Sequence, residues 1–258
     1  MDMMQTITSM HNPKVALWRG LKNRAARQAA GLYLVEGVKM VEEAMRMGLV
    51  QTLLVDMERI TAFGSVTAQA ACEAYSVSPH ILAAICDTKT PQGIVALVNL
   101  PDLPTLDVLG PLIVALDGVQ DPGNVGTILR TADAAGFTGA LLSEECADLY
   151  SPKCLRATMG SIFRMKALVC ANLAQSLDRL KNKGFHVISG ELNGTPFYSR
   201  EALGNQLCLV IGSEGNGVCK EVSNVCTHRL TLPMGGGAES LNAAVAAGIM
   251  MYDLIHRN

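Results

Sequence analysis

Short apolar runs recur along the second half of the chain at the spacing of buried strands. They lie at residues 111–117, 139–143, 166–170, 185–189 and 206–212. Between them, residues 127–135 and 172–183 are predicted helices, and Gly136 and Gly184 stand where each helix should stop. Apolar strands that alternate with helices are typical of a parallel sheet covered on both faces. We therefore predict an α/β fold with a parallel sheet for this half.

The first hundred residues alternate in the same way over shorter segments. Strands are expected at residues 32–35, 50–56 and 93–99, and helices from Pro13 to Gly31 and at residues 37–47, 66–74 and 79–86. Three prolines then interrupt residues 99–111, which read as a linker. The pattern predicts two α/β domains, at residues 1–100 and 112–258, joined by a linker at residues 101–111.

The stretch from Leu230 to Tyr252 combines an apolar run, three glycines at 235–237 and a helix rich in small residues. Glu239, Ser240 and Asn242 are polar residues where that helix opens. Consecutive glycines allow a ligand to approach the backbone closely, and a first helical turn offers unpaired N–H groups. An ordinary strand-to-helix turn with Ser240 as N-cap is an equal alternative on these residues alone.

Composition restricts the class of protein. With 258 residues and 49% apolar residues, the chain can bury a full core. It has neither a long uncharged apolar run for a membrane span nor the order of a secretory signal, so we expect a cytoplasmic protein without a membrane segment. Eight cysteines form no CxxC pair and five histidines show no ligand spacing. Neither a disulfide framework nor a metal site is predicted.

The charge is nearly balanced overall but unevenly distributed. The formal net charge of −2 argues against nonspecific binding of a polyanion over the whole surface. Between His11 and Met40, however, a first basic cluster contains a single acid, Glu36, among six basic residues: Lys14, Arg19, Lys22, Arg24, Arg27 and Lys39. A second basic cluster consists of Lys153, Arg156, Arg164 and Lys166. Two local basic clusters are typical of a protein that binds a nucleic acid at particular places on its surface. The alternative is that each cluster is a solvent-exposed helix face without a binding function.

Three polar loops follow apolar strands of the second half. They begin at Asp117, at Gly212 and after Leu230. Ligands of open parallel sheets bind beyond the carboxyl ends of the strands, so these loops are the candidate site. Their glycine spacing fits neither the dinucleotide fingerprint nor a P-loop.

The sequences of these loops resemble a known family. NVGTILRTADAAG, LVIGSEGNGV and LPMGGGAESLNAAVAAG are similar, in order and separation, to the three motifs of the SpoU (TrmH-type) RNA ribose 2′-O-methyltransferases of the SPOUT superfamily. NPKVALWRGL, GLYLVEGVKMVEEAM and TPQGIVALVN resemble the L30e-like substrate-binding domain of that family. The resemblance implies an L30e-like domain followed by a parallel sheet with a deep trefoil knot, and S-adenosylmethionine as cofactor.

Matching motif to motif assigns the catalytic roles. The expected catalytic residues are Arg130, Asn124, Glu214, Ser240 and Asn242. Arginine stays protonated in proteins, so we interpret Arg130 as a clamp on the phosphate beside the target ribose and not as a general base. Glu214 is a candidate for pairing with Arg130 or for taking the proton of the hydroxyl. Without the resemblance, an ion pair between Arg130 and Asp133 would be the preferred interpretation.

The resemblance also implies ligands and partners. The cofactor is expected beside Gly212, Leu232 and Leu241, with the glycines at 235–237 in the wall that faces it. Homodimers form through this domain in the family, so part of the final helix, 241–256, is expected to be shared. The apolar residues of that helix, Leu241, Val245, Ile249 and Ile255, otherwise have the spacing of a core stripe.

Ribosomal RNA is the expected substrate, because an L30e-like domain resembles a ribosomal RNA-binding module. Transfer RNA is the alternative substrate. A catalytically inactive RNA-binding protein and a small-molecule methyltransferase are the alternative classes of function.

Overall fold

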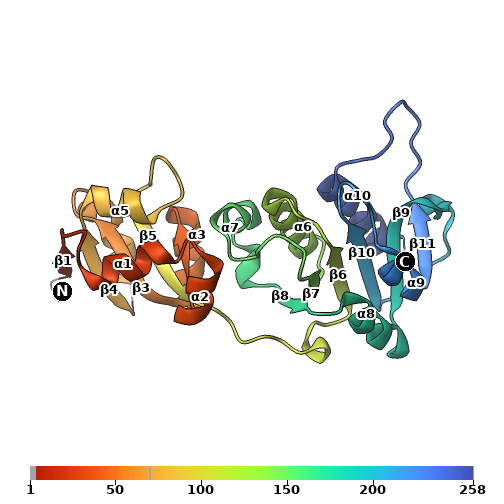
Figure 1. Cartoon of the computed structure of the whole chain (residues 1–258), viewed down its shortest axis with the longest axis horizontal. Coiled ribbons are helices and arrows are strands. Elements are labelled where there is room, and N and C mark those ends of the chain that lie inside the picture. Colours follow the sequence, from red (N-terminus) through yellow and green to blue (C-terminus); the bar gives the residue numbers. More distant parts are fainter. Residues whose placement is uncertain (1–3, 70, 258) are drawn as a thin grey trace. The chain divides into compact units, whose positions relative to one another are not determined.

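The computed structural model describes residues 4–69 and 71–257, and the chain divides into two compact units. The first unit comprises Met1–Asp102 together with Tyr150–Phe163, and the second comprises Leu103–Leu149 and Arg164–Asn258. Figure 1 labels most of the helices and strands of both units along the chain.

The first unit is built on a five-stranded mixed sheet in the order β1-β4-β3-β5-β2. Its strands are β1 (Gln5–Ile7), β2 (Leu32–Glu36), β3 (Val50–Asp56), β4 (Glu73–Val77) and β5 (Ile94–Asn99). β1, β4 and β3 run parallel, whereas β5 is antiparallel to both β3 and β2. The helices are α1 (Pro13–Gly20), α2 (Arg24–Ala30), α3 (Val38–Arg46), α4 (Gly64–Ala68), α5 (Pro79–Ile85) and α7 (Pro152–Thr158).

The predicted helix from Pro13 to Gly31 is in fact two helices. Asn23 interrupts it, because its side-chain oxygen accepts hydrogen bonds from the backbone N–H groups of Ala25 (2.8 Å) and Ala26 (3.4 Å) and so caps α2. Arg27 of the first basic cluster is buried and donates to the Leu21 carbonyl at 2.8 Å. This arginine therefore closes the turn between the helices and is not part of the basic surface.

The expected helix at residues 66–74 was wrong over its second half. α4 ends at Ala68, and residues 73–77 form β4 between β1 and β3. Tyr75 in the middle of this strand is 2% exposed and packs against Trp18, with ring centroids 5.6 Å apart. Residues 73–77 form a strand because they pair with a strand on each side. The local pattern of apolar residues did not indicate this pairing.

Residues 150–163 belong to the first unit, although the sequence placed them in the domain at 112–258. The Tyr150 ring lies 4.8 Å from that of Tyr33 on β2, and burial raises the pKa of the Tyr33 hydroxyl. Arg156 on α7 pairs with Asp87 at 2.7 Å. One arginine of the second basic cluster thus makes a structural ion pair.

The second unit contains a six-stranded sheet in the order β11-β9-β10-β6-β7-β8, with every neighbouring pair parallel. The strands are β6 (Leu112–Asp117), β7 (Gly139–Ser143), β8 (Lys166–Cys170), β9 (His186–Pro196), β10 (Leu207–Gly212) and β11 (His228–Thr231). The predicted parallel sheet is confirmed, and its five predicted strands start and stop within a few residues of the observed ones, except that β9 continues to Pro196.

Helices cover both faces of this sheet. α8 (Leu173–Asn182) and α9 (Lys220–Val225) pack on one face, where Leu177 and Val222 join the core around Val210. α6 (Pro122–Ala134) and α10 (Ala243–His256) pack against each other and against β6 and β10. Within this unit, Figure 1 shows the two helix pairs on opposite sides of the strands. No helix of the described chain is both long and apolar enough for a bilayer span.

The buried face of α10 differs from the predicted one. Its buried residues are Ala243, Ala244, Ala247, Met250, Met251 and Leu254. The predicted core stripe is instead largely exposed, with Val245 at 51%, Ile249 at 38% and Leu241 at 37%. The buried residues of the first half of α10 are alanines, and the helix lies close to α6, where a Cβ on Gly248 would be 3.4 Å from the Thr131 methyl group.

An ion pair fastens the connection between β9 and β10 to α10. Arg200 Nη1 lies 2.6 Å from Asp253 Oδ1, with side-chain exposures of 5% and 15%. The guanidinium also lies 4.2 Å from the centroid of the Phe197 ring. Arg257 pairs with the same carboxylate at 3.2 Å, but its side chain is 59% exposed.

We predict that Arg200→Met lowers the free energy of unfolding by about 3 kcal/mol, because it leaves a largely buried carboxylate with only an exposed partner, Arg257. Arg257→Met removes an exposed partner of the same group and should cost less than about 1 kcal/mol. Urea denaturation of both variants measures the difference. If both variants lose the same free energy of unfolding, burial does not explain the strength of the pair between Arg200 and Asp253.

Candidate active site

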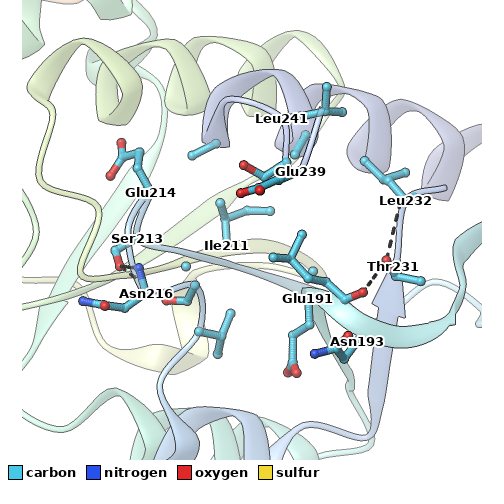
Figure 2. A pocket seen from close by; sticks show the side chains of 18 of the residues that line it. Glu191, Asn193, Ile211, Ser213, Glu214, Asn216, Thr231, Leu232, Glu239 and Leu241 are labelled. Carbon is cyan, nitrogen blue, oxygen red and sulfur yellow. Dashed lines mark hydrogen bonds between the residues drawn. The ribbon is translucent and has the colours of Figure 1, made fainter. Parts of the chain in front are cut away.

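A pocket with a volume of about 500 Å³ opens where β10 and β11 end (Figure 2). Its lining comes from four segments, within residues 190–193, 211–218, 230–234 and 239–250. β9 contributes because it separates locally from β11: Ser189 pairs with Arg229 and Thr195 pairs with Leu230, so residues 190–194 have no partner in β11. The volume suits a small-molecule ligand or cofactor.

The loop after β10 depends on Gly212. Ser213 and Gly217 form a tight bridge in which each N–H donates to the carbonyl of the other, at 3.0 and 2.9 Å. A Cβ on Gly212 would lie 2.0 Å from the carbonyl carbon of Gly217, which no adjustment of a side chain can relieve. The residue must be glycine for this loop to close.

Two helices begin beside the pocket with side-chain caps. Asp121 caps α6 by accepting the N–H of Asn124 at 3.0 Å, so Asn124 lies inside the first turn and not before the helix. Asn242 caps α10, accepting the N–H groups of Ala244 (2.9 Å) and Val245 (3.3 Å). The alternative of Ser240 as N-cap is therefore wrong.

Side chains of the three loops meet in one hydrogen-bonded chain. Asn124 Nδ2 donates to Glu214 Oε1 at 2.5 Å. Asn242 Nδ2 donates to Asn124 Oδ1 at 3.1 Å. Glu214 and Ser240 also line the pocket. The structure thus brings together four of the five expected catalytic residues, which come from segments up to 118 residues apart.

Arg130 is the exception. It lies on an exposed face of α6 and makes neither a hydrogen bond nor an ion pair with residues 4–69 or 71–257. The expected alternative, an ion pair with Asp133, does not form because Asp133 pairs with Arg164 at 2.6 Å. Six residues turn an α-helix by about 240° beyond one full turn, so Arg130 and Asn124 point about 120° apart.

The three expected cofactor contacts, Gly212, Leu232 and Leu241, all line the pocket, and Figure 2 labels the two leucines. The glycines at 235–237 do not line it. None of them has a positive φ, and a Cβ on any of them would meet no atom within 4 Å. They belong to the loop that projects between β11 and α10 in Figure 1, so the expectation that they form the pocket wall was wrong.

Sequence reasoning missed Glu191. Its Oε1 accepts hydrogen bonds from Ser189 Oγ at 2.6 Å and from Ser223 Oγ at 2.7 Å, and the residue lines the pocket. The signal was present, because Glu191 follows the predicted strand at 185–189 just as the other polar loops follow theirs.

Asp117 connects the ends of two central strands. Its Oδ2 accepts the N–H of Cys219 at 2.7 Å and so ties the segment after β10 to the end of β6. Burial, and then the nearby Asp117 carboxylate, raises the pKa of the Cys219 thiol. In the part of the chain that the structure describes, no three His, Cys, Asp or Glu side chains are grouped so that they could hold a metal ion.

Comparison with protein families shows to which family the chain belongs. The model of the SpoU rRNA Methylase family matches residues 111–252, which include all three loops. The chain belongs to the SpoU rRNA methylase family. The MRM3-like substrate binding domain matches residues 12–96, within the first unit.

Individual members of the SpoU family are similar over nearly the whole chain. The 23S rRNA (guanosine(2553)-2′-O)-methyltransferase RlmP of Bacillus subtilis (strain 168) is 37% identical over 97% of this chain and 99% of its own length. The crystal structure of the SpoU methyltransferase AviRb from Streptomyces viridochromogenes with its cofactor AdoMet has a TM-score of 0.87 at 28% identity, covering 95% and 97% of the two chains. An AdoMet-bound rRNA methyltransferase from Sinorhizobium meliloti has a TM-score of 0.86 at 30% identity, covering 97% of each chain.

We predict that Gly212→Ala destabilises the chain by about 1–3 kcal/mol, because the added carbon must displace backbone. The same variant should weaken binding of S-adenosylmethionine by about tenfold or more. Gly215→Ala is the matched control in the same loop, since a Cβ there meets no atom within 4 Å and the residue has no positive φ. Thermal unfolding and calorimetric titration measure both effects, and equal behaviour of the two variants would contradict the steric argument.

Proposed function

We propose that this chain is an S-adenosylmethionine-dependent methyltransferase that methylates a ribose 2′-hydroxyl of ribosomal RNA in the cytoplasm. The observation that carries this proposal is the side-chain network Glu214–Asn124–Asn242, which joins three loops beside one pocket. The 37% identity to an rRNA 2′-O-methyltransferase over nearly the full length supports the same substrate class.

The pocket fits the cofactor by shape and by chemistry. Its volume of about 500 Å³ and its mixed lining, with exposed backbone around Gly212 and side chains such as Leu232 and Leu241, suit an adenosine with a short polar tail. When bound, S-adenosylmethionine supplies a methyl group on a sulfonium. We assign Gly212, Leu232 and Leu241 as its contacts.

Glu214 is positioned to act on the hydroxyl that is methylated. One of its carboxylate oxygens is occupied by Asn124, and the other has no hydrogen-bond partner among the described residues. A carboxylate so oriented can accept a hydrogen bond from the ribose hydroxyl and take its proton as the oxygen attacks. Asn124 holds this carboxylate in place and is itself held by Asn242, and the Ser240 hydroxyl offers a further hydrogen bond at the pocket lining.

Arg130 fits the role of a phosphate clamp. Its guanidinium is exposed and has all of its donors available within the described chain. A planar guanidinium binds phosphate oxygens in a bidentate manner, which would fix the nucleotide next to the target ribose. Its separation from Glu214 is consistent with a contact to the RNA backbone and not to the reacting hydroxyl.

The first unit supplies RNA binding in this proposal. Its match to a substrate binding domain supports an L30e-like fold for residues 1–100. Arg19, Lys22 and Arg24 are exposed around the turn between α1 and α2. This surface is smaller than the sequence suggested, because Arg27 is buried and Lys14 is hydrogen-bonded to Tyr75.

The second unit is proposed to contain the family's trefoil knot. β10 follows both β6 and β9 in the chain yet lies between them in the sheet. The segment after β10 then passes beside β6, to which Asp117 ties it, before β11 forms the outer edge next to β9. This order supports a chain end that passes through an earlier loop.

A second copy of the chain is proposed to cover the exposed face of α10. Val245, Ile249 and Tyr252 follow one another at helical spacing and are 51%, 38% and 44% exposed. Apolar stripes of this kind mark interaction surfaces, and a two-fold symmetric pair buries the same stripe on both copies. We therefore propose a homodimer through the second unit.

The test of function is methyl transfer from labelled S-adenosylmethionine to total cellular RNA, separated by size and mapped for 2′-O-methyl stops. We expect label in the large ribosomal RNAs. Label confined to transfer RNA would show that transfer RNA, and not ribosomal RNA, is the substrate. If no RNA is labelled although the cofactor binds, the proposed enzymatic function is refuted.

In the same assay, Arg130→Ala should reduce methyl transfer by about 100-fold or more, because a misplaced phosphate leaves the hydroxyl out of line. Cofactor binding and thermal stability should be unchanged, since Arg130 is exposed and has no hydrogen bond or ion pair with residues 4–69 or 71–257. Unchanged turnover would remove Arg130 from the mechanism.

For the dimer, Ile249→Glu should weaken association by about 30-fold or more, because it places a charge in an apolar contact. Leu17→Glu is the matched control, as Leu17 is an apolar residue with 46% exposure on α1. Light scattering after gel filtration measures both. A wild-type monomer, or a dimer that tolerates Ile249→Glu, would contradict the proposed surface.

A further inference from the structure

The lining of the pocket carries charges of one sign. Glu191, Glu214 and Glu239 line it, whereas no lysine, arginine or histidine does among the described residues. Each glutamate comes from a different segment, and Figure 2 shows the three at separate positions around the space. Glutamate side chains are negatively charged at neutral pH, so the pocket offers a field that favours a cation.

Two of the three carboxylates are already held by the protein. Glu191 accepts hydrogen bonds from the hydroxyls of Ser189 and Ser223, and Glu214 accepts one from the amide of Asn124. Glu239 has no hydrogen bond or ion pair within the described residues. Of the three, it is the carboxylate with the most capacity left for a charged ligand.

Methyl transfer changes the charge of the molecule in this pocket. The bond between sulfur and the methyl carbon breaks, the bond between the ribose oxygen and that carbon forms, and the hydroxyl proton is released. The sulfonium recovers an electron pair and becomes a neutral thioether. S-adenosylmethionine, with a sulfonium, an ammonium and a carboxylate, has a net charge of +1, whereas the product S-adenosylhomocysteine has a net charge of zero.

We propose that the acidic lining, and Glu239 in particular, makes the pocket select the sulfonium cofactor over its thioether product. This inference rests on the proposal that the pocket holds S-adenosylmethionine. The selection favours binding of fresh cofactor and release of product after each turnover. Glu239 is a specificity residue in this scheme and takes no part in the transfer itself.

The expected size of the effect follows from exposure. Glu239 lies in an exposed part of the lining, so solvent and salt screen its interaction with the ligand. A screened pair of opposite charges contributes a factor of roughly fivefold at most in affinity. The preference should therefore be measurable at low ionic strength and should decrease as salt is added.

The experiment is calorimetric titration of the full chain with three probes at low and high ionic strength. The probes are S-adenosylmethionine, S-adenosylhomocysteine and sinefungin, in which a protonated amine replaces the sulfonium. We expect the two cationic ligands to bind more tightly than the thioether. Glu239→Gln should reduce this preference by roughly fivefold while the affinity for S-adenosylhomocysteine changes little. Glu144→Gln, the same change at an exposed glutamate outside the lining, should leave the preference unchanged.

The outcomes separate this inference from the proposed function. An unchanged preference in Glu239→Gln, or an equal loss for all three ligands, overturns the inference and leaves the cofactor site in place. If the wild-type chain binds none of the three ligands, the assignment of the pocket fails, and the inference fails with it.

Discussion

The site depends on one amide side chain that faces two ways. Asn124 donates to Glu214 with its nitrogen and accepts from Asn242 with its oxygen. An amide can join an acceptor to a donor in this manner, whereas an aspartate at the same place would repel Glu214 and an apolar residue would link neither. Both neighbours are anchored independently, since Asn242 caps α10 and the loop of Glu214 is closed by the bridge between Ser213 and Gly217.

The parallel sheet makes this meeting possible. β6, β10 and β11 point the same way, so the segments that follow them emerge at one edge although they are far apart in sequence. The loop after β10 folds back directly onto the end of its own strand, and only glycine at position 212 leaves room for this close approach. The local separation of β9 from β11 at residues 190–194 opens the remaining side of the pocket.

Sequence could predict the features that depend on local patterns. The strands of the second unit were found because they are apolar throughout, and the loops were found because polar residues follow them. It could not predict β4 or the place of α7, since each is determined by packing against segments distant in the chain. The sequence predicted that a polar residue caps the last helix but not which one. Ser240 and Asn242 are both good N-caps, and the geometry of the turn selected Asn242.

The position of Arg130 shows why spacing matters as much as residue type. A residue seven after Asn124 shares its side of the helix, and Thr131 at that position indeed faces Gly248 of α10. An arginine there would stand against α10 in place of Thr131. The spacing of six places the Arg130 guanidinium on the exposed face of α6, away from the side on which Asn124 contacts Glu214. The difference between a spacing of six and a spacing of seven residues thus separates the positive charge of Arg130 from the negative charge of Glu214.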